Sequence, residues 1–308
     1  MHYRNLILTI LMLWFAASAF ALPSAEAQQS RPKSVVDRLL YEADRLMSRG
    51  DFVNARVLLL RAQKLEPNNA SVYKNLARTS SNNIERLSDG FVEAERFLKK
   101  SISLNPKDAH SYSQLAELNV TKGDFQEALK YADISIKLAP EFTEGYFCRA
   151  LALSNLKRYG EAVKSIDKYI EYCAPKDKIK GLDTKASILE NGGLHKDALA
   201  VYKSAYAISK QDTYLYRQAT CLEKDGKYNE AIQVLNGQLR INPHDDQAMV
   251  QRARIYNKAG QAEKALADYT AAIKELPASI YFKERGAIYK KMGRSDLFER
   301  DMKAAANI

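Results

Sequence analysis

The sequence predicts an all-α chain built from about eight helical hairpins, and three patterns in its 308 residues predict it. Small residues occur in pairs twelve positions apart, turn residues lie between the two members of most pairs, and prolines follow the second member. The patterns share one phase and recur every 33 to 39 residues. A period of this length is typical of helical repeat proteins, in which each unit is one helix-turn-helix hairpin.

The small residues form the first pattern, and nearly all of them are alanine. A small side chain on each of two antiparallel helices lets the backbones approach closely, which larger side chains would prevent. The pairs are Ala43/Ala55, Ala77/Ala94, Ala116/Ala128, Ala150/Ala162, Ala186/Ala198, Ala219/Ala231, Ala253/Ala265 and Gly286/Phe298. The second pair requires a five-residue insertion, which we place between Ser80 and Asp89, and the last pair is a divergent copy.

Turn residues and prolines mark the ends of the predicted helices. Glycine ends a helix because it tolerates a positive φ angle, and proline cannot continue one. The glycines between paired positions are Gly50, Gly90, Gly123, Gly226, Gly260 and Gly293, and the prolines that close repeats are Pro67, Pro106, Pro140, Pro175, Pro243 and Pro277. The repeats therefore begin near residues 36, 70, 109, 143, 179, 212, 246 and 279, and the array covers residues 36–308.

The third repeat, from Ala109 to Phe142, carries the clearest family pattern. It has an aromatic residue at position 4, small residues at positions 8, 20 and 27, and proline at position 32. These residues are Tyr112, Ala116, Ala128, Ser135 and Pro140. The pattern resembles the tetratricopeptide repeat, and the resemblance covers everything after about residue 36. It implies a right-handed superhelical solenoid that binds a peptide or helix of a partner protein in its concave groove.

In this family the first helix of each hairpin lines the concave face, so the resemblance also implies candidate partner-binding residues. They are Lys74, Arg78, Ser113, Glu117, Phe147, Leu151, Asp183, Tyr216, Val250 and Arg254. The groove would be basic at one end and apolar in the middle. An alternative for Phe147 and Tyr216 is packing between adjacent first helices. Some family members grip a terminal carboxylate with basic and amide residues, and Lys74 and Asn75 match that chemistry. Flanking repeats do not match it, so we predict no such clamp.

The sequence contains no constellation that predicts an enzyme, a cofactor or a metal site. Three histidines, His110, His195 and His244, lie in separate repeats, and no glycine-rich phosphate loop or nucleophile motif occurs. Three cysteines, Cys148, Cys173 and Cys221, have spacings unlike any zinc or redox motif. We expect small buried hydrophobic residues, with a Cys148–Cys173 disulfide as the alternative.

The N-terminal segment has the pattern of a secretory signal. Basic residues precede the apolar run Leu6–Ala17, and Ala25-Glu26-Ala27 suits a signal peptidase. We predict a signal peptide at residues 1–27, a linker at 28–35 and a periplasmic or extracellular mature protein with no transmembrane domain. An uncleaved anchor is the alternative, because residues 6–22 just reach the roughly 17 residues that a helix needs to span a membrane.

The charge balance bears on the class of partner. Lys and Arg total 47 against 37 Asp and Glu, which gives a net charge of +10. Both signs are interspersed along the helices, so a well-solvated mixed surface explains the excess, and nucleic acid is not an expected partner. We expect a non-catalytic protein-binding scaffold in the cell envelope or secretory space. The alternative is an envelope tether for polysaccharide secretion or cell-wall assembly, acting on an anionic polymer through the basic surface.

Overall fold

The computed structural model describes residues 34–81 and 87–308, with side chains described outside residues 82–88. The predicted signal peptide, residues 1–27, and nearly all of the predicted linker lie outside this part. Within it, sixteen α-helices and one short 3₁₀ helix follow one another without a β-strand, so the predicted all-α hairpin fold is confirmed. The chain divides into two compact units, unit 1 ending at Tyr172 and unit 2 spanning Cys173–Ile308.

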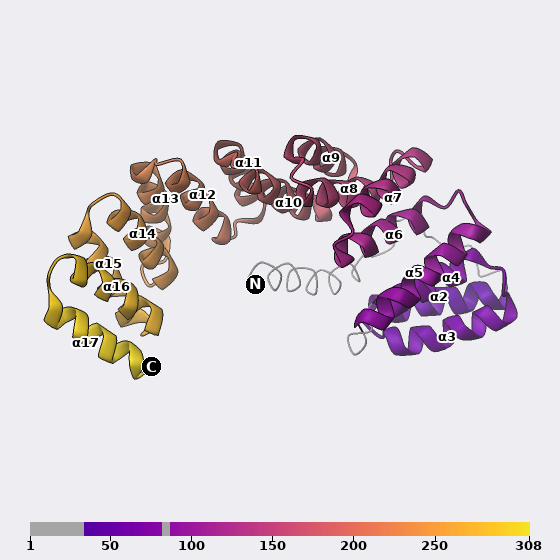
Figure 1. The fold of residues 1–308 in the computed structure, drawn as a ribbon, viewed down its shortest axis with the longest axis horizontal. Helices are drawn as coiled ribbons and strands as arrows, with labels where there is room; N and C mark the ends of the chain where they lie inside the picture. Colours follow the sequence, from indigo (N-terminus) through magenta and orange to yellow (C-terminus); the bar gives the residue numbers. More distant parts are fainter. Residues whose placement is uncertain (1–33, 82–86) are drawn as a thin grey trace. The chain divides into compact units, whose positions relative to one another are not determined.

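Each unit contains four hairpins (Figure 1). Those of unit 1 are α2 (Val35–Ser48) with α3 (Phe52–Leu65), α4 (Ala70–Ser81) with α5 (Leu87–Leu104), α6 (Ala109–Lys122) with α7 (Phe125–Leu138), and α8 (Thr143–Asn155) with α9 (Tyr159–Tyr172). In unit 2 the 3₁₀ helix η4 (Pro175–Asp177) precedes α10 (Lys178–Asn191) with α11 (His195–Ser209), α12 (Thr213–Lys224) with α13 (Tyr228–Ile241), α14 (Asp246–Lys258) with α15 (Ala262–Glu275), and α16 (Ser279–Lys291) with α17 (Ser295–Ala306). Each first helix begins within one residue of a predicted repeat start.

The paired alanines lie at the contact between the two helices of each hairpin. None of the fourteen is more than 2% exposed. The last hairpin departs from the alanine pattern. Gly286 replaces the first alanine, and the much larger Phe298 replaces the second. A Cβ atom at Gly286 would lie 2.7 Å from Met302 Cε and 3.3 Å from Asp301 Cβ, so the glycine makes room for these side chains of α17, and the Phe298 ring lies at an ordinary contact distance of 3.5 Å.

One predicted turn is wrong. Gly90 lies inside α5, because that helix already begins at Leu87. A Cβ atom there would be 2.5 Å from the backbone oxygen of Ser80, so glycine is required by close approach of α4 rather than by a turn. Gly123 shows the expected behaviour: it has φ +87° and caps α6, where its N–H donates to carbonyl oxygens of the last turn.

In three first helices, an arginine side chain forms hydrogen bonds to the second helix on either side, and we call this arrangement an arginine pin. The sequence patterns do not predict these contacts. Arg252 of α14 donates through Nε and Nη2 to both carboxylate oxygens of Asp268 at 2.7 Å, and through Nη1 to Asn236 Oδ1 at 2.5 Å. It thereby joins α14 to its own second helix, α15, and to α13 of the preceding hairpin. The other two pins are Arg149 with Asp133 and Ser165, and Arg285 with Thr270 and Asp301.

The hydrophobic interior follows the hairpin pattern. Cys148 is a buried thiol whose Sγ lies 3.7 Å from the Ser113 carbonyl oxygen, packed with Ala116 and Ala132. Cys221 is also a buried thiol.

Across residues 34–81 and 87–308, no helix combines the length and the apolar composition that crossing a membrane requires.

Candidate partner-binding surface

In unit 1, the predicted site begins with two cations on α4. Lys74 Nζ lies 3.2 Å from Asp108 Oδ2, at the N-terminus of α6, and Arg78 Nη1 lies 3.0 Å from Asp44 Oδ1 on α2. The Lys74 side chain is 21% exposed and that of Arg78 is 33% exposed. Both cations are therefore paired with acids of neighbouring hairpins while part of each side chain still faces solvent.

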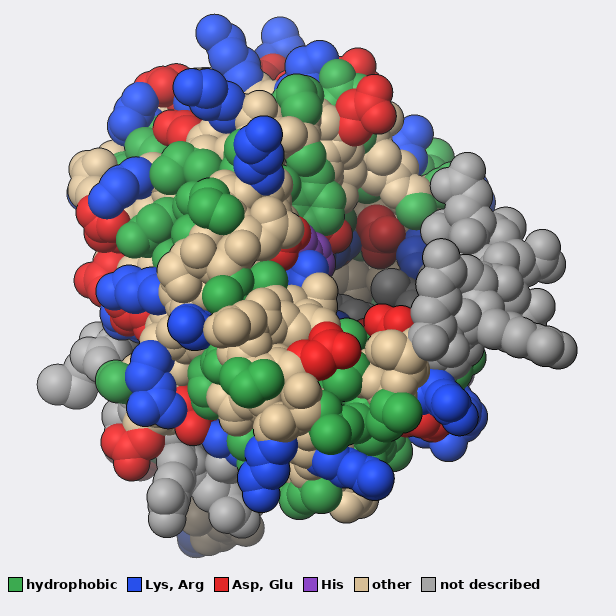
Figure 2. Space-filling model, turned by 90° about the vertical axis from the view of Figure 1, so that its right-hand side faces the viewer, with side chains coloured by type: hydrophobic (Ala, Val, Ile, Leu, Met, Phe, Trp, Pro, Cys, Tyr) green, Lys and Arg blue, Asp and Glu red, His purple; other side chains and the backbone are tan. Residues whose placement is uncertain are grey.

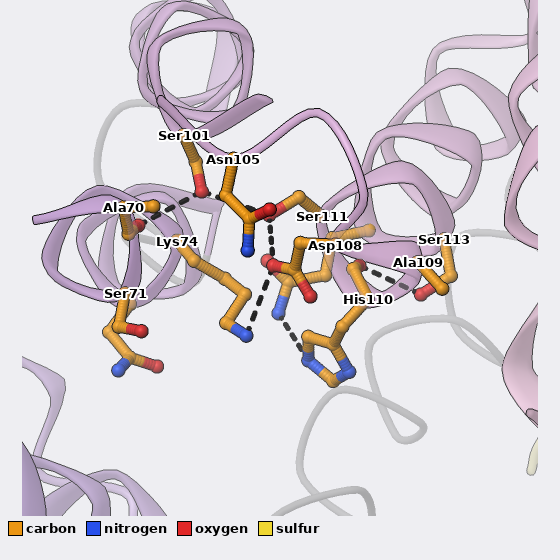
Figure 3. Close-up of polar contacts among 12 residues, drawn as sticks. Ala70, Ser71, Lys74, Ser101, Asn105, Asp108, Ala109, His110, Ser111 and Ser113 are labelled. Carbon is orange, nitrogen blue, oxygen red and sulfur yellow. Dashed lines mark hydrogen bonds and ion pairs between the residues drawn. The ribbon is translucent and has the colours of Figure 1, made fainter. Parts of the chain in front are cut away.

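A hydrogen-bonded chain behind Lys74 holds Asp108 in place (Figure 3). Ser111 Oγ donates to Asp108 Oδ2 at 2.7 Å and lies 2.9 Å from Ser101 Oγ, which donates to the Ala70 carbonyl oxygen. Burial opposes ionisation of Asp108, but the Ser111 hydrogen bond and the Lys74 charge outweigh it and hold the pKa of this carboxyl below its ordinary value. Asp108 is thus a fixed anion that positions Lys74.

His110 lies next to this ion pair and is neutral at physiological pH. Its Nε2 atom is 2.9 Å from Gln114 Nε2, and its ring packs against Phe142 with centroids 5.3 Å apart. Burial, with the nearby charges of Lys74 and Arg78, lowers the pKa of His110 to about 4. The Oε1 atom of Gln114 is buried and finds no hydrogen-bond partner among the described residues.

Three of the predicted surface residues are buried, which corrects their assignment to the partner-facing surface. Ser113, Phe147 and Val250 are 3%, 4% and 3% exposed. The Phe147 ring packs on Tyr169 of α9 with centroids 5.0 Å apart, so packing is its role in this structure. These positions face the contact between neighbouring helices, where the closeness of packing leaves no room for a partner.

The other predicted residues of unit 2, Asp183, Tyr216 and Arg254, are half-buried or exposed and contact polar groups of adjacent hairpins. The Tyr216 hydroxyl donates to Asp245 Oδ2 at 2.5 Å, and Arg254 makes two hydrogen bonds to Glu284 at 2.8 and 2.9 Å. Burial raises the pKa of the Asp183 carboxyl, although Tyr214 donates a hydrogen bond to it. In unit 1, Glu117 and Leu151 are partly exposed.

The three predicted cations of the first helices are therefore already paired. Lys74, Arg78 and Arg254 each have a carboxylate partner, which reduces the positive field that they present to solvent. On the molecular face in Figure 2, Lys and Arg side chains are interspersed with Asp and Glu. Among the residues with described positions, no group of three His, Cys, Asp or Glu side chains is arranged to hold a metal ion.

Comparison with known proteins agrees with the hairpin geometry. Models of the tetratricopeptide repeat match residues 113–178 and 222–282. A TPR repeat-containing protein of Methanocaldococcus jannaschii is 33% identical over 98 residues, which cover 31% of this chain and 31% of that protein. The Hsp70-Hsp90 organizing protein of Triticum aestivum is 33% identical over 82 residues, covering 27% of this chain and 14% of that protein.

Among solved structures, PilW, described as a widely conserved type IV pilus biogenesis factor, has a TM-score of 0.58 at 16% identity. The match covers 68% of this chain and 94% of PilW. The chain spans about a third of the length of the first curated relatives it matches. The repeat matches, the buried alanine pairs and the succession of helical hairpins lead to one conclusion. The chain belongs to the tetratricopeptide repeat family.

Proposed function

We propose that this chain is a non-catalytic scaffold that holds a peptide or a helix of a partner protein on its first-helix faces. Tetratricopeptide repeat proteins are protein-interaction scaffolds. The observation that carries the proposal is the set of partly exposed cations, Lys74, Arg78 and Arg254, each paired with an acid of a neighbouring hairpin. An acidic group of a partner can bind beside the intramolecular acid, because a Lys ammonium has three N–H donors and an Arg guanidinium has five, more than one carboxylate uses.

Recognition on this surface is spread over several shallow contacts. Tyr216 offers part of an aromatic ring whose hydroxyl is already satisfied by Asp245, so a partner can bury the ring without an unmade hydrogen bond. Glu117 and Leu151 complete the candidate surface of unit 1, and Asp183 completes that of unit 2. Within each unit, such a row of positions suits an extended peptide or one face of a helix.

The binding test uses the chain from Gln28 onward and an envelope extract. Lys74→Ala and Arg254→Ala should weaken capture of a specific protein band, identified by mass spectrometry, with unchanged circular dichroism. The matched control is Lys164→Ala, an exposed lysine on the second helix α9. Equal losses from Lys74→Ala and Lys164→Ala would contradict a binding site on the first helices.

We also propose that the protein is exported and begins at Gln28 after cleavage behind Ala27. The support is the sequence pattern of residues 1–27. Intact mass of the protein recovered from its producing cells tests this directly. A mass that retains the apolar run would establish the uncleaved anchor instead.

The alternative function, a tether for an anionic envelope polymer, rests on the net charge of +10. Its weakness is that many cations already have carboxylate partners, so they contribute little free positive field. The two functions differ in their response to salt. Groove binding should survive moderate ionic strength, whereas capture that disappears above about 0.15 M salt would favour the tether.

A further inference from the structure

The opposite side of unit 1, formed by second helices, carries an exposed apolar stripe. Val53, Val57 and Leu60 of α3 are 77%, 61% and 37% exposed. Their spacing of four and three residues places them on one face of the helix. Val92 of α5 is a fourth exposed apolar residue, with 71% of its surface accessible. Exposed valines at helical spacing are not needed by the hairpin packing, since the buried side of α3 is formed by Ala55, Leu59 and Ala62.

A depression of about 590 Å³ lies between α3 and α5. It is lined by Arg56 of α3, Ser80 of α4, and Asp89, Gly90, Val92, Glu93 and Arg96 of α5, and its lining does not include the stripe residues Val53, Val57 and Leu60. Arg56 Nη2 lies 2.7 Å from Glu93 Oε1, so the floor is held by an ion pair. The ion pair thus holds α3, which carries the stripe, next to α5, which carries Val92.

Positively charged side chains lie beside the apolar stripe. Further along α3, Arg61 and Lys64 follow the apolar stripe and make no ion pair with any described residue. On α5, Arg96 lies one turn beyond Val92, is 73% exposed and reaches Glu93 only at 3.8 Å. The helix α3 contains no acidic residue. Cations with little or no pairing thus gather next to the apolar stripe, in contrast to the paired cations of the first-helix faces.

We propose that this surface, defined by Val53, Val57, Leu60, Val92, Arg61, Lys64 and Arg96, docks an acidic amphipathic helix of a partner protein. An apolar stripe with the same helical spacing would pack against the valines, and Asp or Glu side chains at its border would meet Arg61, Lys64 and Arg96. The surface lies on second helices, so it is independent of the first-helix site. One chain could therefore join two partners.

Two other occupants fit the observations less well. A second copy of this chain that packed its α3 against this α3 would place its cations against Arg61 and Lys64, since that helix supplies no acid. A membrane surface is usually bound through large side chains such as Trp, Phe and Leu, whereas this stripe is mainly valine. Charge and side-chain size together favour the acidic helix.

The test uses a labelled synthetic helix with Leu at the i, i+4 and i+7 positions and Glu beside them, titrated with the full chain by fluorescence anisotropy. Val57→Glu should weaken binding at least about tenfold, as expected for a charge placed at the centre of an apolar contact. The double variant Arg61→Glu with Lys64→Glu should weaken it similarly and reduce its salt dependence. Ile241→Glu, at a residue of α13 that is 74% exposed, is the matched control and should have no effect.

Several outcomes would overturn the proposal. They are equal binding of a peptide with Lys in place of Glu, unchanged binding by Val57→Glu, a dimer in sedimentation that Val57→Glu dissociates, and binding to phosphatidylglycerol vesicles without binding to the peptide. Lys74→Ala should leave peptide affinity unchanged. That control separates failure of this surface from failure of the first-helix site.

Discussion

At the scale of single residues, His110 makes stability depend on pH. Its pKa is lowered from 6.5 to about 4 in the folded protein, because burial and the charges of Lys74 and Arg78 outweigh the attraction of Asp108 and Asp44. His110 therefore binds a proton below about pH 6.5 in the unfolded chain, but only below about pH 4 in the folded chain. The His110 contribution to stability is fully present above pH 6.5 and is lost as pH falls toward 4.

Replacing His110 by Gln should remove this dependence. We expect the wild type to lose about 3 kcal/mol more stability than the variant between pH 6.5 and pH 4, from about 1.4 kcal/mol for each unit of pKa shift. Urea unfolding at several pH values measures the difference. Parallel stability curves for the two proteins would show that His110 does not titrate in this way.

Gly90 provides a second test at the residue scale. Alanine is ordinarily favoured over glycine inside a helix by about 1 kcal/mol, but a Cβ atom here would lie 2.5 Å from the Ser80 backbone oxygen. We expect Gly90→Ala to destabilise the protein by about 1–3 kcal/mol through overpacking. Gly237→Ala, inside α13 with only Arg240 Nη2 within 4 Å, should instead raise the melting temperature. A stabilising Gly90→Ala would mean that α4 and α5 are further apart.

At the scale of helical elements, the arginine pins stabilise the contact between hairpins. The side chains of Arg252 and Asp268 are 21% and 10% exposed, so removing the cation leaves a largely buried carboxylate unpaired. We expect Arg252→Ala to cost about 2–4 kcal/mol. Thermal unfolding should show the loss, and a double-mutant cycle with Asp268→Ala should show strong coupling. Arg158→Ala, which removes an exposed pair with Glu161, should leave the melting temperature unchanged.

The arginine pins have a regular spacing in the sequence that the repeat pattern alone does not reveal. Arg149 and Arg252 each have a polar partner sixteen residues before and sixteen residues after, and Arg285 has partners fifteen before and sixteen after. This spacing joins a first helix to the second helices on either side. Its meaning becomes visible only when the hairpin geometry is known, because Asp and Asn at those positions otherwise resemble solvated surface residues.

At the scale of the whole molecule, each unit has an interior of its own. Unit 2 contains a cluster that includes Met249, Val250, Tyr269 and Ile288. Because a repeat array is stabilised by contacts between neighbouring hairpins, we expect residues 173–308 expressed alone to be helical and to unfold cooperatively. A fragment that begins at His195 removes α10 and its contacts with α11, and should lose helicity beyond the missing residues. Circular dichroism compares the two, and equal helicity per residue would contradict this dependence.

The sequence by itself determined the family and the order of the hairpins. Alanine pairs, turn glycines and closing prolines report local geometry, because helix ends and close helix contacts restrict which residues fit at those positions. The first helices accordingly begin within a residue of the predicted starts. Gly90 was misassigned because the insertion shifted the beginning of α5, and a glycine residue alone does not distinguish a turn from a close helix contact.

The tertiary structure decided which first-helix residues are exposed to a binding partner and which carry an unbalanced charge. Phe147 and Val250 were predicted on the surface but are buried, because exposure depends on how closely another hairpin packs. Lys74 and Arg254 are partly exposed, yet their charge is balanced by Asp108 and Glu284 from neighbouring hairpins. Exposure and pairing are properties of contacts between residues about 30 positions apart. Helical periodicity within one repeat contains no information about those contacts, so only the packed array reveals them.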